Sequence, residues 1–167
     1  MSDHGAPPQQ FVTWRSVTDS AERTRALAAA LAGVALPGDR LALVGPLGAG
    51  KTQFAKGFAV GLGITEVVNS PSFTLMAEYQ GRLTLFHQDL YRLAGTEEAL
   101  AGGLLDERQD EGVTLSEWAD RLDGALDPGR LTVTFEPVGE DERAIGLTGR
   151  GGIAERYVAA ARDWTAA

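Results

Sequence analysis

Eight consecutive residues, Gly45 to Thr52, carry the clearest chemical signal in this chain. They read GPLGAGKT and match the pattern G-x-x-x-x-G-K-[ST] in full, between an apolar run and a helical pattern. In such a loop the backbone N–H groups turn inward around a polyphosphate, and the dipole of the following helix attracts the same anion. Lys51 would reach the β- and γ-phosphates, and the Thr52 hydroxyl would complete the shell of a Mg²⁺ ion. The motif therefore predicts binding of a nucleoside triphosphate with Mg²⁺.

Two acidic residues each stand at the end of an apolar, strand-like run. Asp89 ends the run 83–89, and Glu117 lies at the end of the run 112–118. A carboxylate at the end of a strand is how a nucleotide-binding fold presents an acid to the Mg²⁺ shell. Aspartate is also a common turn residue, so spacing alone leaves Asp89 equally consistent with a turn. Glu117 competes with Asp89 for the metal-side role.

The composition excludes several other kinds of chemistry. The chain has no cysteine, which excludes thiol catalysis, disulfides and cysteine-ligated metals. His87 is the only histidine outside the N-terminal tail, so a histidine-built zinc site is also excluded. The net charge of −8 argues against a surface that grips nucleic acid alone. If RNA is involved, we expect a partner to hold most of it.

The apolar pattern predicts the elements that must position these side chains. Strands are expected at 11–14, 40–44, 73–79, 83–89, 112–118, 131–135 and 144–147. Helices are expected from Asp19 or Ser20 to Gly33, over 51–62 and 152–164, and in shorter form near 96–105 and 118–126. The predicted architecture is a three-layer α/β fold of the P-loop NTPase kind. Its mainly parallel sheet is widened by an antiparallel hairpin and edge and has helices on both faces. Nucleotide is expected to bind beyond the carboxyl ends of the parallel strands.

The length of 167 residues suits a single domain, expected over 11–167 after a loose tail at 1–10. The tail has neither a basic n-region nor an apolar h-region, and no stretch approaches eighteen apolar residues. We therefore expect a cytoplasmic protein with no membrane association.

Four short motifs occur in one order along the chain. GPLGAGKT is followed by SPSF at 70–73, HQDLYR at 87–92 and EW at 117–118. Together with the single-domain length, these motifs resemble the TsaE family, the small bacterial P-loop ATPases needed to make threonylcarbamoyladenosine in tRNA. The resemblance covers residues 11 to 136, and the three motifs beyond the P-loop are not shared by general nucleotide kinases.

The resemblance implies roles for individual residues. The nucleotide-binding set is Gly45, Leu47, Gly48, Ala49, Gly50, Lys51, Thr52, Gln53 and Trp118. Two switch-like loops would contain Ser70, Ser72 and Phe73, and then Leu90, Tyr91 and Arg92 after Asp89. The metal-side residues would be Thr52, Asp89 and Glu117, and the catalytic residues Lys51, Asp89 and Glu117. This chain departs from the family at Pro46, where an acid is usual, and has Gln53 and Ser72 where threonine is usual.

The implied function is an ATP-binding and ATP-hydrolysing subunit that acts as a nucleotide-driven switch. Its assembly would make N6-threonylcarbamoyladenosine at position 37 of tRNA, with TsaB and TsaD as protein partners by resemblance. Isolated turnover is expected to be slow, because no arginine finger is identifiable.

Two alternatives stay open. A small-molecule kinase would need an arginine-bearing lid, for which Arg82 and Arg92 are the only arginines near the middle motifs. Pro46 leaves room for a subunit that binds nucleotide without hydrolysing it. A GTPase is disfavoured, because the chain has no N-K-x-D motif.

Overall fold

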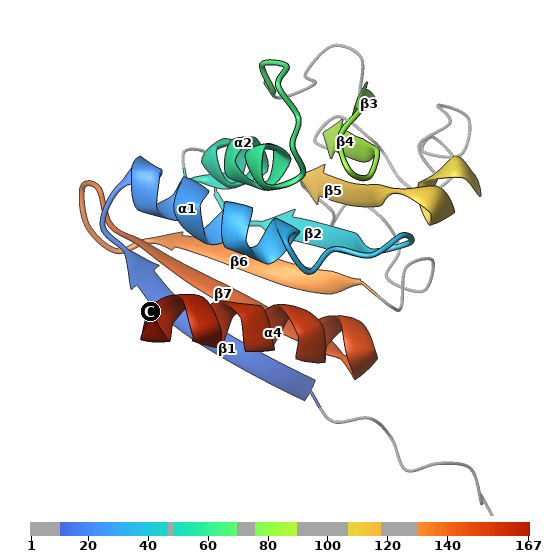
Figure 1. The fold of residues 1–167 in the computed structure, drawn as a ribbon. Helices are drawn as coiled ribbons and strands as arrows, with labels where there is room; N and C mark the ends of the chain where they lie inside the picture. Colours follow the sequence, from blue (N-terminus) through green and yellow to red (C-terminus); the bar gives the residue numbers. More distant parts are fainter. Residues whose placement is uncertain (1–10, 47–48, 70–75, 90–106, 118–129) are drawn as a thin grey trace, which may run out of the picture.

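A seven-stranded sheet forms the centre of the protein, with strand order β1-β7-β6-β2-β5-β4-β3 (Figure 1). The computed structural model describes residues 11–46, 49–69, 76–89, 107–117 and 130–167. In chain order its elements are β1 (Phe11–Thr18), α1 (Ala21–Ala32), β2 (Arg40–Val44), α2 (Lys51–Gly61), β3 (Met76–Tyr79), β4 (Leu85–Asp89), the 3-10 helix η1 (Glu107–Glu111), β5 (Val113–Glu117), β6 (Leu131–Pro137), β7 (Arg143–Arg150) and α4 (Gly151–Ala166).

The sheet is mixed, parallel at its centre and antiparallel at both margins. β2 pairs in parallel with β5 and β6, and β4 pairs in parallel with β5. The pairs β1–β7, β6–β7 and β3–β4 are antiparallel. The expected hairpin and the antiparallel pairing of 131–135 with 144–147 are confirmed, while the expectation of a mainly parallel sheet holds only for the centre. The edge strands are β1 and β3. The expectation that 144–147 is an edge is wrong, because β1 lies outside β7 and pairs with it over all eight residues.

Helix α1 packs between α2 and α4, and Figure 1 shows the three helices side by side on one face of the sheet. The expected three layers, with helices on both faces, are therefore not seen among the described residues. The close approach of α1 and α2 depends on Gly57 and Gly61, where a Cβ would lie 2.2 Å and 2.4 Å from backbone carbonyl oxygens of α1. The core beneath these helices joins Phe54 and Phe58 of α2 to apolar strand residues. The shorter helices expected near 96–105 and 118–126 lie outside the described residues, as does the strand start at 73–75.

The three described helices begin and end close to the predicted positions. The side chain of Ser20, rather than Asp19, caps α1 by accepting a hydrogen bond from the Arg23 backbone N–H at 3.1 Å. The expected span 51–62 is confirmed by α2, whose predicted apolar stripe is buried. β1 extends four residues beyond the expected end at Trp14, since its pairing with β7 continues to Thr18.

Asp39, the residue before β2, joins this strand to α4. Its carboxylate accepts two hydrogen bonds from Arg156 and one from the Tyr157 hydroxyl, each at 2.8 Å. It also accepts a bond from the Leu36 backbone N–H at 2.9 Å. Asp39 is buried, so the Asp39 cluster (Asp39, Arg156 and Tyr157) holds the start of β2 against the C-terminal helix. No helix in the described part of the chain is long and apolar enough to cross a membrane.

Candidate nucleotide site

The P-loop motif lies between β2 and α2, as the sequence predicts. Gly45 follows the last residue of β2 and passes close to β6, where a Cβ on it would lie 2.6 Å from the Phe135 carbonyl oxygen. Gly50 is the N-cap of α2 with a φ of 107°, a left-handed conformation that favours glycine. No side chain caps this helix. The N-terminal turn of α2 is therefore built like an anion site, with backbone N–H groups and the positive end of the helix dipole.

Lys51 is folded back across this loop. Its side chain is buried, 5% exposed, and its Nζ donates a hydrogen bond to the Gly45 carbonyl oxygen at 2.5 Å. A phosphate oxygen in the loop would be a stronger partner than a neutral carbonyl, because a hydrogen bond between two charged groups is about twice as strong. The Lys51 ammonium is thus held against the backbone of the P-loop. Thr52, the next residue, is half-buried in the first turn of α2.

The two candidate acids end neighbouring strands. Asp89 is the last residue of β4 and Glu117 the last residue of β5, and the two are direct partners in the parallel register. Glu117 also lies one strand from the P-loop, because β2 pairs with β5 with Leu43 opposite Glu117. The carboxyl ends of three adjacent parallel strands therefore bring Gly45, Glu117 and Asp89 to one edge of the sheet.

Strand alternation shows on which face the acids lie. Leu115, two residues before Glu117, belongs to the core cluster with Phe54 and Phe58 of α2. Residues i and i+2 of a strand share a face, so Glu117 faces the α2 side of the sheet. Asp89, its partner in the parallel register, lies on the same side. Both acids therefore lie on the side of the sheet that α2, with Lys51 and Thr52 in its first turn, covers.

His87, the first residue of the HQDLYR motif, belongs to this site although it was not among the predicted site residues. Its Nε2 lies 2.6 Å from Oε2 of Glu117, and the imidazole is fully buried. An ionised carboxylate only accepts hydrogen bonds, so we assign the proton of this bond to Nε2. The other ring nitrogen, Nδ1, is buried with no hydrogen-bond partner in the structure described. The position of His87 two residues before Asp89 could have indicated that it lies on the same face.

Other predicted site residues have different surroundings. Gln53 accepts a hydrogen bond from Arg25 of α1 at 2.6 Å, so its side chain connects the two helices. Ala49 is buried in the core, and Pro46 is exposed with its carbonyl accepting from the Ala49 N–H at 3.2 Å. Eight predicted residues lie outside the described ranges: Leu47, Gly48, Ser70, Ser72, Phe73, Tyr91, Arg92 and Trp118. Leu90, from the second expected switch loop, also lies outside them.

The donor set fits Mg²⁺ brought with a nucleotide better than a resident metal. Among the described residues, no three histidine or acidic side chains are grouped to hold a metal ion. Mg²⁺ is typically bound by one or two carboxylates together with substrate phosphates and several waters. Thr52, Asp89 and Glu117 would supply hard oxygen donors of this kind at the end of the P-loop.

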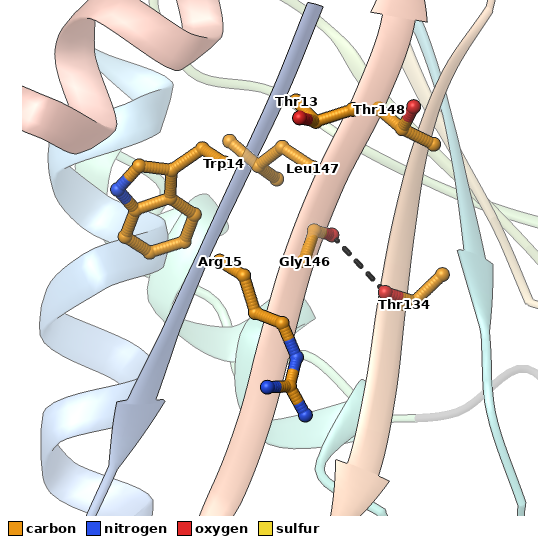
Figure 2. Close-up of a pocket in the computed structure, with 7 residues that line it drawn as sticks. All are labelled: Thr13, Trp14, Arg15, Thr134, Gly146, Leu147 and Thr148. Carbon is orange, nitrogen blue, oxygen red and sulfur yellow. Dashed lines mark hydrogen bonds between the residues drawn. The ribbon is translucent and has the colours of Figure 1, made fainter.

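A hollow elsewhere on the sheet carries no comparable chemistry. It lies over β1, β7 and β6, and its lining is Thr13, Trp14, Arg15, Thr134, Gly146, Leu147 and Thr148 (Figure 2). The hydroxyl of Thr134 makes a long hydrogen bond of 3.5 Å to the Gly146 carbonyl oxygen, drawn as a dashed line in Figure 2. The one charged lining residue, Arg15, forms an exposed ion pair with Glu136. The candidate site is therefore the P-loop edge of the sheet.

These features define the class of protein: an α/β protein with a mixed sheet, built around a P-loop and two strand-end carboxylates. The family model described as "Threonylcarbamoyl adenosine biosynthesis protein TsaE" matches residues 18–145. The chain belongs to the TsaE family, which confirms the resemblance inferred from the four motifs.

Individual relatives agree with this membership. The tRNA threonylcarbamoyladenosine biosynthesis protein TsaE of Bacillus subtilis is 48% identical over 139 residues, covering 83% of this chain and 85% of the relative. The protein of the same name from Treponema pallidum is 39% identical over 131 residues, covering 78% and 97%. The crystal structure of Bacillus subtilis YdiB superposes with a TM-score of 0.69 at 38% identity, covering 96% of this chain and 98% of that one.

Proposed function

We propose that this chain is the ATP-binding and ATP-hydrolysing subunit of the assembly that makes N6-threonylcarbamoyladenosine at position 37 of tRNA. The observation that carries the proposal is that β2, β5 and β4 end side by side, where Gly45, the hydrogen-bond partner of Lys51, and the acids Glu117 and Asp89 stand. Membership of the TsaE family supports the link to this tRNA modification. The nucleotide would act as a switch that changes how the subunit engages its partners.

The residues of the site would divide the work of ATP hydrolysis. Lys51 would leave the Gly45 carbonyl and bind the β- and γ-phosphates, aided by the N–H groups of the first turn of α2. Thr52, Asp89 and Glu117 would hold Mg²⁺, directly or through its waters. When bound, Mg²⁺ neutralises the charge that develops on the phosphates during their transfer.

The remaining family motifs would form the moving parts. The segments with Ser70, Ser72 and Phe73 and with Tyr91 and Arg92 would respond to the γ-phosphate, as switch loops do. Trp118 would lie near the nucleotide. TsaB and TsaD are the proposed partners, and the net charge of −8 favours contact with tRNA mostly through them.

The small-molecule kinase hypothesis is weakened by the contacts of Arg82, one of its two candidate lid arginines. Arg82 donates hydrogen bonds to the carbonyl oxygens of Ala32 at 2.8 Å and Ala35 at 3.2 Å, at the C-terminal end of α1. A guanidinium held by these carbonyls stabilises a helix end and does not cover phosphates. This observation favours the ATPase over the small-molecule kinase.

Nucleotide binding is tested by a matched pair of lysine variants. Lys51 and Lys56 are the only lysines of the chain and both lie on α2, and Lys56 bonds to Asn69 instead of the P-loop. Lys51→Ala should weaken binding of a slowly hydrolysed ATP analogue with Mg²⁺ about 10- to 100-fold, the loss of one charge-assisted hydrogen bond. Lys56→Ala should bind as the natural chain does. Equal affinity of the two variants would contradict the assignment of the P-loop.

Tests of ATP hydrolysis and of the role in the pathway require the partner proteins. We expect turnover of ATP to rise when TsaB and TsaD are added, and to fall in Asp89→Ala with the circular dichroism spectrum unchanged. A pull-down from cell extract should recover the modification proteins in one nucleotide state, ATP or ADP, and not in the other. Tight ATP binding without hydrolysis in the full set of partners would instead support a non-hydrolysing subunit.

A further inference from the structure

The most deeply buried polar contact of the site joins His87 of β4 to Glu117 of β5. The His87 side chain is 0% exposed and Glu117 is 4% exposed, and the bond from Nε2 to Oε2 is 2.6 Å long. A carboxylate taken out of water is costly unless it receives hydrogen bonds. His87 supplies this bond and thereby stabilises Glu117 at the end of its strand.

The geometry fixes one oxygen of Glu117. His87 and Glu117 are on adjacent parallel strands, and the ladder between β4 and β5 holds their backbones in register. The carboxyl group of glutamate has three side-chain torsions, so a bond to a rigid neighbour removes much of its rotational freedom. Within the described residues, the bond from His87 to Oε2 is the hydrogen bond found for the Glu117 side chain. The bond therefore orients the carboxylate and leaves its second oxygen for a ligand.

A similar pair on the opposite face of the same strands serves as a structural comparison. Gln88 and Ser116 follow the alternate pleat, and the Ser116 hydroxyl donates to the Gln88 amide oxygen at 2.8 Å. Gln88 is also buried, 1% exposed. This pair faces away from α2 and the P-loop, whereas the His87–Glu117 pair lies on the P-loop side.

We propose that His87 is a positioning residue, which holds the carboxylate of Glu117 in the orientation that ATP hydrolysis needs. The inference rests on the proposed ATPase function of this site. His87 does not touch the nucleotide in this scheme. It acts through Glu117, as the hydrogen-bond partners of metal-ligating groups do when they orient those groups.

The test compares three variants in the presence of the pathway partners. His87→Leu removes the donor but keeps an apolar side chain in the buried place, and should lower kcat about 10- to 100-fold, the range found for such partners. His87→Gln places an amide N–H near the position of Nε2, and should restore kcat to within about fivefold of the natural chain. Gln88→Leu is the matched control, because it makes the same kind of change on the other face.

Two further measurements separate positioning from folding and from nucleotide binding. KM for ATP and the affinity for ATP analogue without Mg²⁺ should change less than about twofold in His87→Leu, since P-loop contacts are untouched. Thermal unfolding should show that both leucine variants remain folded at the assay temperature. Gln88→Leu should keep the kcat of the natural chain.

Each outcome decides the inference. The inference is overturned if His87→Leu keeps the kcat of the natural chain, or if His87→Gln is as defective as His87→Leu. It is also overturned if Gln88→Leu loses as much kcat as His87→Leu. A rise in KM as large as the fall in kcat would also overturn it, because the effect would then lie in nucleotide binding. If the natural chain hydrolyses no ATP with its partners, the proposed function fails and this inference fails with it. An active natural chain that is insensitive to His87→Leu overturns the inference alone.

Discussion

The Asp39 cluster provides a prediction whose magnitude can be worked from the contacts. In Asp39→Ala the Arg156 guanidinium loses both of its hydrogen bonds to Asp39. It keeps its bond to the Val34 carbonyl oxygen, at 2.8 Å. The Tyr157 hydroxyl and the Leu36 N–H lose the acceptor described above. Three donors that were satisfied by one carboxylate are thereby left without it.

The expected cost follows from the burial of these groups. Breaking a buried charge pair by removing one partner costs about 3–5 kcal/mol. The Arg156 side chain is 29% exposed and regains some water, which places Asp39→Ala near the lower end, at about 3 kcal/mol. In a chain of this size, about 2–4 °C of Tm correspond to each kcal/mol, so Tm should fall by about 6–12 °C.

Urea unfolding followed by circular dichroism measures this cost as a shift of the midpoint at unchanged slope. Tyr157→Phe removes one of the bonds and should cost only about 1 kcal/mol. Combining Asp39→Ala with Arg156→Met should give a coupling energy of about 0.5–3 kcal/mol, because the two residues share the bond. A cost below about 1 kcal/mol for Asp39→Ala, typical of an exposed pair, or strict additivity in the cycle would refute the reasoning.

Three further predictions follow from the structure. Burial, and then the charge of Asp39, raise the pKa of Tyr157 above its ordinary value near 10. The stability that the natural chain has over Tyr157→Phe should therefore be fully present below about pH 10 and should be lost as the pH rises above it. Gly45→Ala would place a Cβ 2.6 Å from the Phe135 carbonyl oxygen, and should lower the free energy of unfolding by about 1–3 kcal/mol and weaken nucleotide binding. Arg82→Met removes the guanidinium from the end of α1, and should cost about 1–3 kcal/mol of stability with nucleotide affinity unchanged.

These three predictions have separate controls. A constant difference between the natural chain and Tyr157→Phe from pH 8 to 11 would contradict the raised pKa of Tyr157. For Gly45→Ala, natural stability and affinity would show that the loop can move away from β6. If Arg82→Met weakens ATP binding, Arg82 is again a candidate for a lid over the phosphates, and the small-molecule kinase hypothesis is favoured.

The local elements around the site could be predicted because their signals are local. Helix α2 carries apolar residues at helical spacing and ends at Gly61, with Leu62 as its C-cap, and Gly63 follows with a φ of 78°. The runs that end in Asp89 and Glu117 are strands that end at those acids. Helix periodicity, capping residues and strand alternation depend on residues a few positions apart, and a single sequence shows them directly.

The contacts across the sheet could not be predicted in the same way. β1 pairs with β7, which begins more than a hundred residues later, and nothing in the run 11–18 indicates that partner. The bond from Arg156 to Asp39 likewise joins residues 117 positions apart in the chain. Strand order and such pairs depend on which apolar faces pack together, and many arrangements satisfy the same local pattern.

The sequence alone therefore established the P-loop motif and the family resemblance and predicted the residue types of the site, because each of these is encoded in short contiguous motifs. The folded chain decided where those groups stand relative to one another. It placed Glu117 one strand and Asp89 two strands from Gly45, and it placed His87 against Glu117. The reason is physical: parallel pairing of distant strands brings their carboxyl ends to one edge, and burial then requires each polar group there to find a partner.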